Sequence, residues 1–178
     1  MRIIAGSRKG SRLFAPKGLD TRPTGDRARE AAFNLIGPVD GARVLDLYAG
    51  SGAMGLEALS RGAEAAVFVE RDRAAAEAIV RNLDKLGFTG ATVLRDDAAR
   101  ILAADAASGR RYDLVLVDPP YRLLAGLLPM LSAYLPSVLE PGGLAVVESD
   151  AREEPELPLP LRTSRRYGST RISLFEAP

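Results

Sequence analysis

Residues 44–55 read Val-Leu-Asp-Leu-Tyr-Ala-Gly-Ser-Gly-Ala-Met-Gly. An apolar run ends in a glycine turn that opens a helix, which is how α/β folds place a nucleotide-bearing ligand at the carboxyl edge of a sheet. Gly50, Gly52 and Gly55 match G-x-G-x-x-G, and Glu70 follows 20 residues after Gly50. A carboxylate there can accept both ribose hydroxyl hydrogens. The pattern alone does not separate NAD from S-adenosylmethionine (SAM), or from glycines that only turn a βα unit.

Two further carboxylates favour SAM over NAD. Asp46 stands inside the end of the first strand, where it would suit a cationic ligand and repel a pyrophosphate. Asp97 follows the third expected strand and could accept from an adenine amino group, although Asp96 and Asp97 also fit a helix N-cap.

The segment Asp118-Pro119-Pro120-Tyr121 ends a later strand and is the catalytic candidate. An exocyclic amine is a poor nucleophile because its lone pair is delocalised into the ring. Asp118 and the carbonyl of Pro119 can accept its two N–H bonds, and the prolines fix that carbonyl because their φ is locked. Tyr121 offers a ring on which an extruded base can stack. The structural alternative is a loop that merely ends a strand.

Outward from these motifs the chain alternates strands and helices, which predicts a mostly parallel sheet covered on both faces. The expected strands are 44–47, 65–69, 92–94, 114–117 and 144–148, and the expected helices are 26–36 (capped by Thr24 or Asp26), 53–61, 73–86, 97–107 and a stretch within 122–139. A basic hairpin is expected from 2–5 and 12–14 with its turn at 7–10, and a closing hairpin from 162–167 and 171–176 after an extended linker at 155–160.

Composition limits the chemistry. The 178 residues include no cysteine and no histidine, so disulfides, thiolate metal sites, a cysteine nucleophile and a histidine base are excluded. No apolar run approaches the roughly 18 residues of a membrane span, and no signal peptide opens the chain, so the expected location is the cytoplasm.

The net charge of +1 hides an asymmetry between the ends and the middle of the chain. Residues 1–30 carry eight basic and three acidic side chains, and residues 160–178 carry four basic and one acidic. Basic ends on an acidic body suggest contact with a polyanion, while the plain alternative is ordinary surface charge. In the first segment the cations alternate with Gly6, Ser7, Gly10 and Ser11, which would let the backbone approach phosphates.

These residues resemble the RsmD-type bacterial methyltransferases, which act on the guanine N2 amino group of small-subunit ribosomal RNA. The resemblance covers nearly the whole chain and rests on Arg2-Ile3-Ile4-Ala5-Gly6, Gly10-Ser11-Arg12-Leu13, Thr21-Arg22-Pro23-Thr24 with Arg27, Arg29 and Glu30, Leu45–Gly62, Glu70, Asp97, the Asp-Pro-Pro-Tyr box and Tyr167-Gly168-Ser169-Thr170. It implies a seven-stranded, Rossmann-like SAM-dependent methyltransferase sheet, with Thr21–Thr24 closing over SAM near its amino-acid end. Tyr48 stands where we expect Phe and Met54 where we expect Leu, and both swaps keep an apolar body.

The predictions are therefore a basic RNA-binding extension at 1–36 and a methyltransferase domain at 37–178, acting as a monomer on 16S rRNA, as naked RNA or within an assembling 30S particle. The candidate catalytic residues are Asp118, Pro119, Pro120 and Tyr121; the candidate SAM-binding residues are Arg22, Thr24, Asp46, Tyr48, Gly50, Ser51, Gly52, Glu70, Arg71, Asp97 and Ala98; the candidate RNA-binding residues are Arg2, Arg8, Lys9, Arg12, Arg165 and Arg166. No metal is expected.

Three alternatives differ in kind. A DNA adenine or cytosine amino-methyltransferase would use the same box, but 178 residues leave no room for its target-recognition region. An NAD-dependent oxidoreductase would leave the Asp-Pro-Pro-Tyr box without a role. A non-catalytic RNA-binding module would not explain a cofactor pocket.

Overall fold

The computed structural model describes residues 1–15 and 25–178. Seven strands form one sheet in the order β3-β2-β1-β4-β5-β7-β6, in which β1 to β5 are parallel and β7 runs antiparallel to both neighbours. The strands are β1 Arg43–Leu47, β2 Ala65–Val69, β3 Ala91–Leu94, β4 Tyr112–Val117, β5 Leu139–Asp150, β6 Leu161–Tyr167 and β7 Thr170–Glu176. The helices are α1 Asp26–Ile36, α2 Ala53–Ser60, α3 Arg73–Leu86, α4 Ala98–Ser108 and α5 Tyr121–Val138, with a short 3₁₀ turn at Gly6–Arg8. The predicted α/β class is confirmed.

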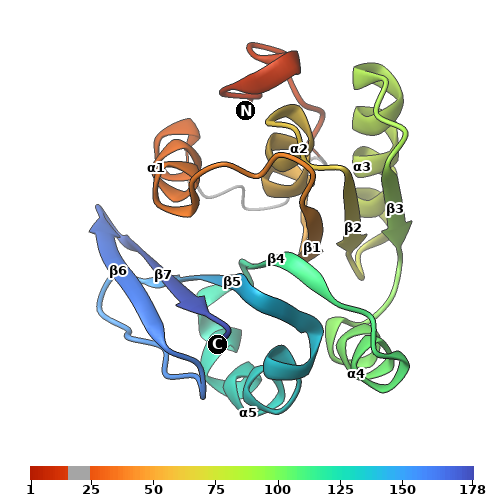
Figure 1. The fold of residues 1–178 in the computed structure, drawn as a ribbon. Coiled ribbons are helices and arrows are strands. Elements are labelled where there is room, and N and C mark those ends of the chain that lie inside the picture. Colours follow the sequence, from red (N-terminus) through yellow and green to blue (C-terminus); the bar gives the residue numbers. More distant parts are fainter. Residues whose placement is uncertain (16–24) are drawn as a thin grey trace.

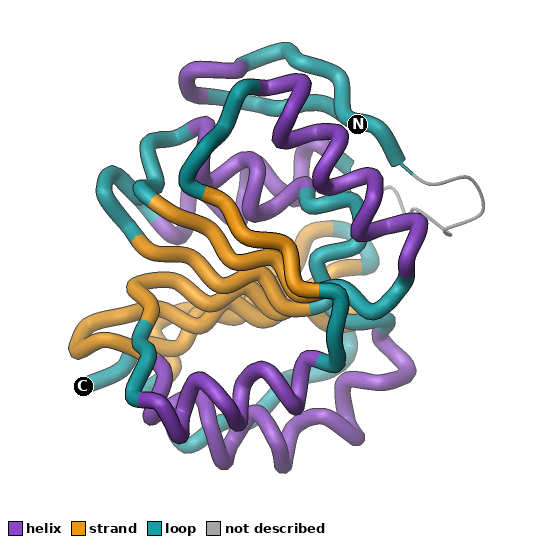
Figure 2. The backbone as a smooth tube through the Cα atoms, turned by 90° about the vertical axis from the view of Figure 1, so that its right-hand side faces the viewer, coloured by secondary structure: helices purple, strands orange, loops and turns teal. Residues whose placement is uncertain are grey.

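Helices cover both faces of the sheet. In Figure 1 α1, α2 and α3 lie above it and α4 and α5 below it, and Figure 2 shows the strands as a twisted layer between the two sets of helices. Short apolar strands need this double cover, because both faces of a parallel sheet must be kept from water. Each face therefore has its own hydrophobic core.

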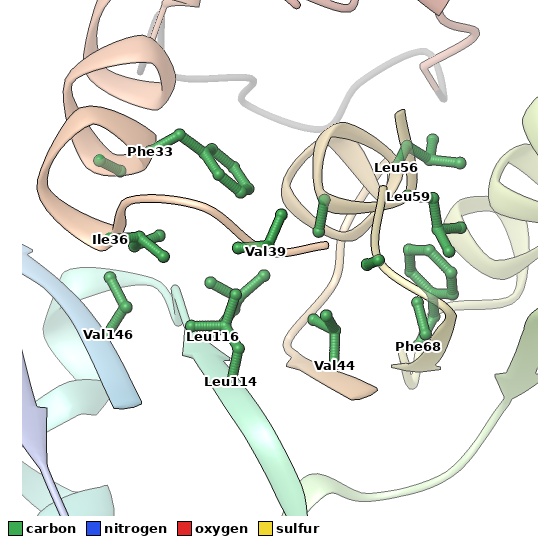
Figure 3. Close-up of a cluster of buried hydrophobic side chains, with 14 of the residues drawn as sticks. Phe33, Ile36, Val39, Val44, Leu56, Leu59, Phe68, Leu114, Leu116 and Val146 are labelled. Atoms are coloured by element: carbon green, nitrogen blue, oxygen red, sulfur yellow. The ribbon is translucent and has the colours of Figure 1, made fainter. Parts of the chain in front are cut away.

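One hydrophobic core lies between the sheet and helices α1, α2 and α3. Figure 3 shows Phe33 of α1 and Leu56 of α2 in one cluster with Val44, Leu116 and other side chains of the central strands. The other core, under α4 and α5, holds the alternate residues of the same strands. Because successive side chains of a strand point to opposite faces, the even-numbered residues of β1 and β4 face α1 and α2.

The N-terminal segment is docked on the helices, and its predicted hairpin is only partly formed. Arg2 and Arg12 make a single antiparallel bridge, and the turn between them is the 3₁₀ turn. The amides of Ile4 and Ala5 donate to the buried carboxylate of Glu57 on α2, at 2.8 and 3.0 Å. Three backbone hydrogen bonds join the two arms of the segment, and the bonds to Glu57 hold the segment on α2. The division into an RNA-binding extension at 1–36 and a methyltransferase domain at 37–178 remains a prediction.

Most predicted boundaries are confirmed within one or two residues, and two details are wrong. The predicted strand 144–148 is β5, which begins at Leu139, because Pro141-Gly142-Gly143 form an irregularity within the strand rather than a turn before it. Helix α1 is capped by Gly25 without a side-chain hydrogen bond, so Asp26 is its first residue and not its cap; Thr24 lies outside the described residues. In the described ranges, no helix is both long and apolar enough to cross a membrane.

Candidate functional site

A pocket of about 410 Å³ opens at the carboxyl ends of the central strands, a volume typical of small-molecule sites. It is lined by Met1, Arg29, Asp46, Tyr48, Ala49, Gly50, Ser51, Ala53, Met54, Val69, Glu70, Arg71, Asp97, Ala98, Asp118, Pro120, Leu123, Leu127 and Glu148. Ligands of open α/β sheets bind at this edge, where neighbouring strands send their connections to opposite faces.

Three carboxylates reach the pocket from adjacent strands. Asp46 lies in β1, Asp118 directly follows β4, and Glu148 lies in β5. Val117 pairs with Val147, so Asp118 and Glu148 are the next residues along their strands. Partners in register point to the same face of a sheet. The register thus gathers on one face acidic groups that are far apart in the sequence.

The glycine turn after β1 has an unusual backbone. Tyr48, Gly50 and Gly52 have φ angles of 60°, 56° and 79°, and Tyr48 is the only non-glycine residue with positive φ in the described part of the chain. Such a conformation is uncommon for a bulky residue and is typical of functional sites. The Gly50 amide donates to Glu70 Oε2 at 2.8 Å, and the Asp72 amide donates to Glu70 Oε1 at 2.7 Å. Glu70 is thereby fixed beside the turn, at the end of β2.

Asp46 is a buried carboxyl, with 2% of its surface exposed. Its pKa is raised to about 7, mainly by burial; the hydrogen bond from the Gly55 amide opposes this increase, and the charges of Asp118 and Glu70 contribute to it. That hydrogen bond to Asp46 Oδ2 measures 2.8 Å. A Cβ on Gly55 would lie 2.4 Å from Phe68 Cε1, so only glycine brings α2 this close to Asp46. A buried acid with a raised pKa beside an open pocket is suited to a cationic ligand.

Asp97 caps α4, as one of the two interpretations of the Asp96-Asp97 pair predicts. Its Oδ1 accepts from the amides of Ala99 and Arg100 at 2.9 and 3.3 Å. Asp97 also lines the pocket, together with Arg71 and Ala98. Burial raises the pKa of Tyr48 to about 12, and the charge of Asp97 adds to this while Arg71 opposes it. The cap therefore holds Asp97 at the pocket wall.

The Asp-Pro-Pro-Tyr segment joins β4 to α5. Asp118 and Pro120 line the pocket, and Tyr121 is the first residue of α5. The Tyr121 hydroxyl lies 2.7 Å from Thr170 Oγ1 and donates to Glu148 Oε1 at 3.2 Å. The sequence predicts only a stacking ring at Tyr121, and the structure adds the contacts of its hydroxyl.

Arg29 of α1 also reaches the pocket, although the sequence did not assign it a role there. Its side chain is 3% exposed and donates to the carbonyl of Arg2 and to Asp26 Oδ1, the latter at 3.0 Å. Its Nε is 3.6 Å from Glu57 Oε2, which is an ion pair but too long for a hydrogen bond, so this N–H has no hydrogen-bond acceptor among the described residues. Arg29 therefore brings to the pocket wall a buried cation that is paired with Asp26 and Glu57.

Most of the predicted SAM-binding residues lie together. Asp46, Tyr48, Gly50, Ser51, Glu70, Arg71, Asp97 and Ala98 all line the pocket, Gly52 lies in the same turn, and Arg22 and Thr24 fall outside the described residues. Pro119 and Tyr121 adjoin the pocket without lining it. Within residues 1–15 and 25–178, no group of three or more acidic side chains could hold a metal ion.

The predicted RNA-binding cations lie in two places, and none of them lines the pocket. Arg2, Arg8, Lys9 and Arg12 belong to the N-terminal segment, and Arg165 and Arg166 belong to β6, one of the two edge strands of the sheet. Arg8 already makes contacts within the protein: its Nε donates to the carbonyl of Leu86 at 2.6 Å, and its guanidinium lies 5.6 Å from the centre of the Phe88 ring.

Comparison with known proteins agrees with this geometry. The family model described as "Conserved hypothetical protein 95" matches residues 1–176. The chain is 43% identical to "Putative rRNA methyltransferase YlbH" of Bacillus subtilis over 185 residues, which cover 99% of this chain and 98% of that protein. It is 44% identical to "Ribosomal RNA small subunit methyltransferase D" of Escherichia coli over 123 residues, which cover 68% of this chain and 61% of that protein. Among solved structures, "Putative methyltransferase yhhF from Escherichia coli" matches with a TM-score of 0.84 and 37% identity, covering 99% of this chain and 97% of that one.

Proposed function

This chain belongs to the Conserved hypothetical protein 95 family, the RsmD-type methyltransferases, and we propose that it methylates the N2 amino group of a guanine in small-subunit ribosomal RNA. The relatives are named as ribosomal RNA methyltransferases, and the Escherichia coli relative is named for the small subunit. The reaction class is SAM-dependent methyl transfer. The choice of guanine N2 is consistent with the RsmD relatives.

The residues of the pocket fit SAM. Its methionine part carries a sulfonium and an ammonium charge, and the buried Asp46 would gain a cationic partner there. Glu70, fixed by the Gly50 and Asp72 amides, would accept from the ribose hydroxyls, and Asp97 from the adenine amino group. A Cβ on Gly50 would have only the Tyr48 carbonyl oxygen within 4 Å, so its backbone is open to the ligand, whereas a Cβ on Gly52 would lie 3.0 Å from Ile79. SAM supplies an electrophilic methyl group, and the protein supplies its position.

The base side of the pocket has groups suited to an amine. Asp118 would accept one N–H of the target amine, and the carbonyl of Pro119 would accept the other. This pairing favours a pyramidal nitrogen whose lone pair faces the methyl group. No side chain needs to act as a nucleophile, so the rate would come mainly from the alignment of nitrogen, methyl and sulfur. The apolar side chains of Leu123 and Leu127 complete this side of the pocket.

The observation that carries the proposal is that Asp46, Glu70 and Asp118 line a single pocket. A cofactor site and an amine-orienting box on opposite sides of the molecule would exclude this chemistry. The remaining parts of the proposal are a monomer in the cytoplasm that acts on naked 16S rRNA or on an assembling 30S particle. The basic N-terminal segment and β6 would hold the RNA backbone.

The test is methyl transfer from labelled SAM to small-subunit ribosomal RNA and to assembling particles, with the product nucleoside identified by mass spectrometry. We expect N2-methylguanosine with the wild type and none with Asp118→Ala, which removes the acceptor for the target amine. Asp84→Ala, which alters an exposed aspartate of α3, is the matched control and should behave as wild type. Methylation of DNA alone, or of another base, would refute the assignment.

A further inference from the structure

Glu148 is a buried acid of the pocket and is not among the residues predicted for the site. It is 7% exposed, lines the pocket from β5 and lies one position beyond the pair Val117–Val147. Asp118 occupies the same position on β4. Two carboxylates from adjacent strands therefore face the place proposed above for the target base.

The Tyr121 hydroxyl connects Glu148 to the closing hairpin. It donates to Glu148 Oε1 at 3.2 Å and lies 2.7 Å from Oγ1 of Thr170, the first residue of β7. Thr170 is 5% exposed, and it belongs to the Tyr167-Gly168-Ser169-Thr170 segment that the sequence singled out without a function. These contacts fix the orientation of the Glu148 carboxylate at the pocket wall.

The chemistry of guanine suits a pair of carboxylates. Its Watson–Crick edge presents two neighbouring donors, the N1–H and the N2 amino group, whereas adenine and cytosine present a ring-nitrogen acceptor beside their amino group. An ionised carboxylate only accepts hydrogen bonds. A second carboxylate beside Asp118 therefore matches guanine and repels the lone pair of a ring nitrogen.

We propose that Glu148 accepts the N1–H of the target guanine while Asp118 holds its N2 amino group, which makes Glu148 a residue that determines base specificity. This inference rests on the function proposed above. Asp118 alone cannot distinguish one exocyclic amine from another, because each offers the same two N–H donors. Glu148 supplies the distinction, because it reads the neighbouring ring position. Extruded bases are commonly read by hydrogen bonds at this edge.

The competing explanation is that Glu148 only holds the Tyr121 ring. The two roles separate with 2-aminopurine, which keeps the 2-amino group but has an acceptor at N1. Glu148→Gln keeps an oxygen for the Tyr121 hydroxyl and adds an N–H that can donate to that acceptor. Tyr121→Phe removes the hydroxyl contact and keeps both the ring and the carboxylate.

The experiment measures single-turnover methyl transfer from SAM to two synthetic ribosomal RNA fragments, which carry guanine or 2-aminopurine at the position that the wild type methylates. For Glu148→Gln we expect the ratio of the guanine rate to the 2-aminopurine rate to fall by about tenfold or more, since a mismatched buried polar group no longer opposes the analogue. SAM affinity should stay within about twofold of wild type, because Glu148 is assigned to the base. Tyr121→Phe should slow both substrates in the same proportion.

An unchanged ratio in Glu148→Gln, or an equal fall in Tyr121→Phe, would overturn the role of Glu148 while the wild type still methylates guanine. A wild type that methylates no guanine in ribosomal RNA would instead overturn the proposed function. Glu148→Asp is the second variant, and it should retain most of the wild-type ratio because the carboxylate remains. Thermal melting of each variant establishes that the rates come from folded protein.

Discussion

The buried carboxyl of Asp46 gives a prediction that connects folding with cofactor binding. Asp46→Asn is the informative change, because the amide has the same shape and its oxygen can still accept from the Gly55 amide, as Asp46 does at 2.8 Å. The variant removes the ionisable group and leaves the packing of α2 against β1 in place. Any effect of pH that it abolishes therefore belongs to this carboxyl.

The magnitude follows from the pKa. Burial raises the pKa of Asp46 from 3.8 to about 7, so the folded protein holds a proton that the unfolded chain has lost. The stability of the protonated form is fully present below about pH 4 and is lost as the pH rises toward about 7. Each pKa unit corresponds to about 1.4 kcal/mol, so the free energy of unfolding should fall by up to about 4 kcal/mol across this range on account of Asp46.

The assay is urea unfolding of wild type and Asp46→Asn without ligand, from about pH 4 to about pH 8. All other groups titrate in both proteins, so the difference between the two unfolding free energies isolates Asp46. We expect the variant to become more stable relative to wild type as the pH rises. A difference that stays constant over this range would show that the carboxyl ionises in the folded protein as easily as in water.

The same variant should bind SAM more weakly. A cationic ligand beside Asp46 favours ionisation, so the wild-type affinity for SAM should rise from about pH 5.5 to about pH 7.5. Loss of the charge should cost about 1.5–3 kcal/mol, or roughly 10- to 100-fold in the dissociation constant. Calorimetry with SAM and with its demethylated product, which lacks the sulfonium charge, measures both effects. Equal affinity of variant and wild type at every pH would remove Asp46 from the cofactor site.

Three other changes have definite expectations. Asp118→Ala should abolish methyl transfer and leave SAM affinity within a few-fold, measured by single turnover and calorimetry, because Asp118 is assigned to the target amine; normal turnover would end that assignment. Replacing Lys9 and Arg12 with alanine should weaken RNA binding and reduce the slope of its salt dependence by about two, since each phosphate contact contributes about one; an unchanged slope would mean that they contact no phosphate. Gly55→Ala should lower the free energy of unfolding by about 1–3 kcal/mol in urea titrations, because its Cβ would lie 2.4 Å from Phe68; unchanged stability would show that Phe68 can move aside.

The sequence predicts the parts of the fold that depend on local signals. Helix α3 ends at Leu86 because Gly87 takes the left-handed conformation, with φ of 68°, and α1 ends at Ile36, before Gly37, whose φ is also positive, at 88°. Strand β5 is longer than predicted because Pro141-Gly142-Gly143 resembles a turn in isolation, whereas β4 and β7 hold the segment in the sheet. Whether such a segment is a turn or part of a strand depends on the strands beside it, and these are distant in the sequence.

Some residues of the candidate site can likewise be predicted from local signals, and others cannot. The glycine turn, Glu70 and Asp118 are predictable because each directly follows an apolar run, at the strand end where parallel sheets bind ligands. Glu148 also follows an apolar run, at 144–147, so the same signal could have assigned it to the site, whereas Arg29 reaches the pocket only through the packing of α1. A Tyr hydroxyl or a buried Arg has no sequence pattern of its own. Only the folded structure shows that such side chains lie at the pocket.

The count of basic residues illustrates the limit of composition as a guide to RNA binding. Several of the arginines that make the chain ends basic serve the fold: Arg29 is buried beside Glu57, and Arg171 is 9% exposed and donates to the carbonyl of Ala151. Arg8 contacts the end of α3, so its loss should lower stability as well as RNA affinity. Lys9 and Arg12 are exposed on the N-terminal segment, and they are the cleaner probes of phosphate contact. A variant that removed all the basic residues of this segment would combine the loss of contacts between the segment and the helices with the loss of contacts to RNA. Only Lys9 and Arg12 should therefore be replaced, with Arg8 left in place.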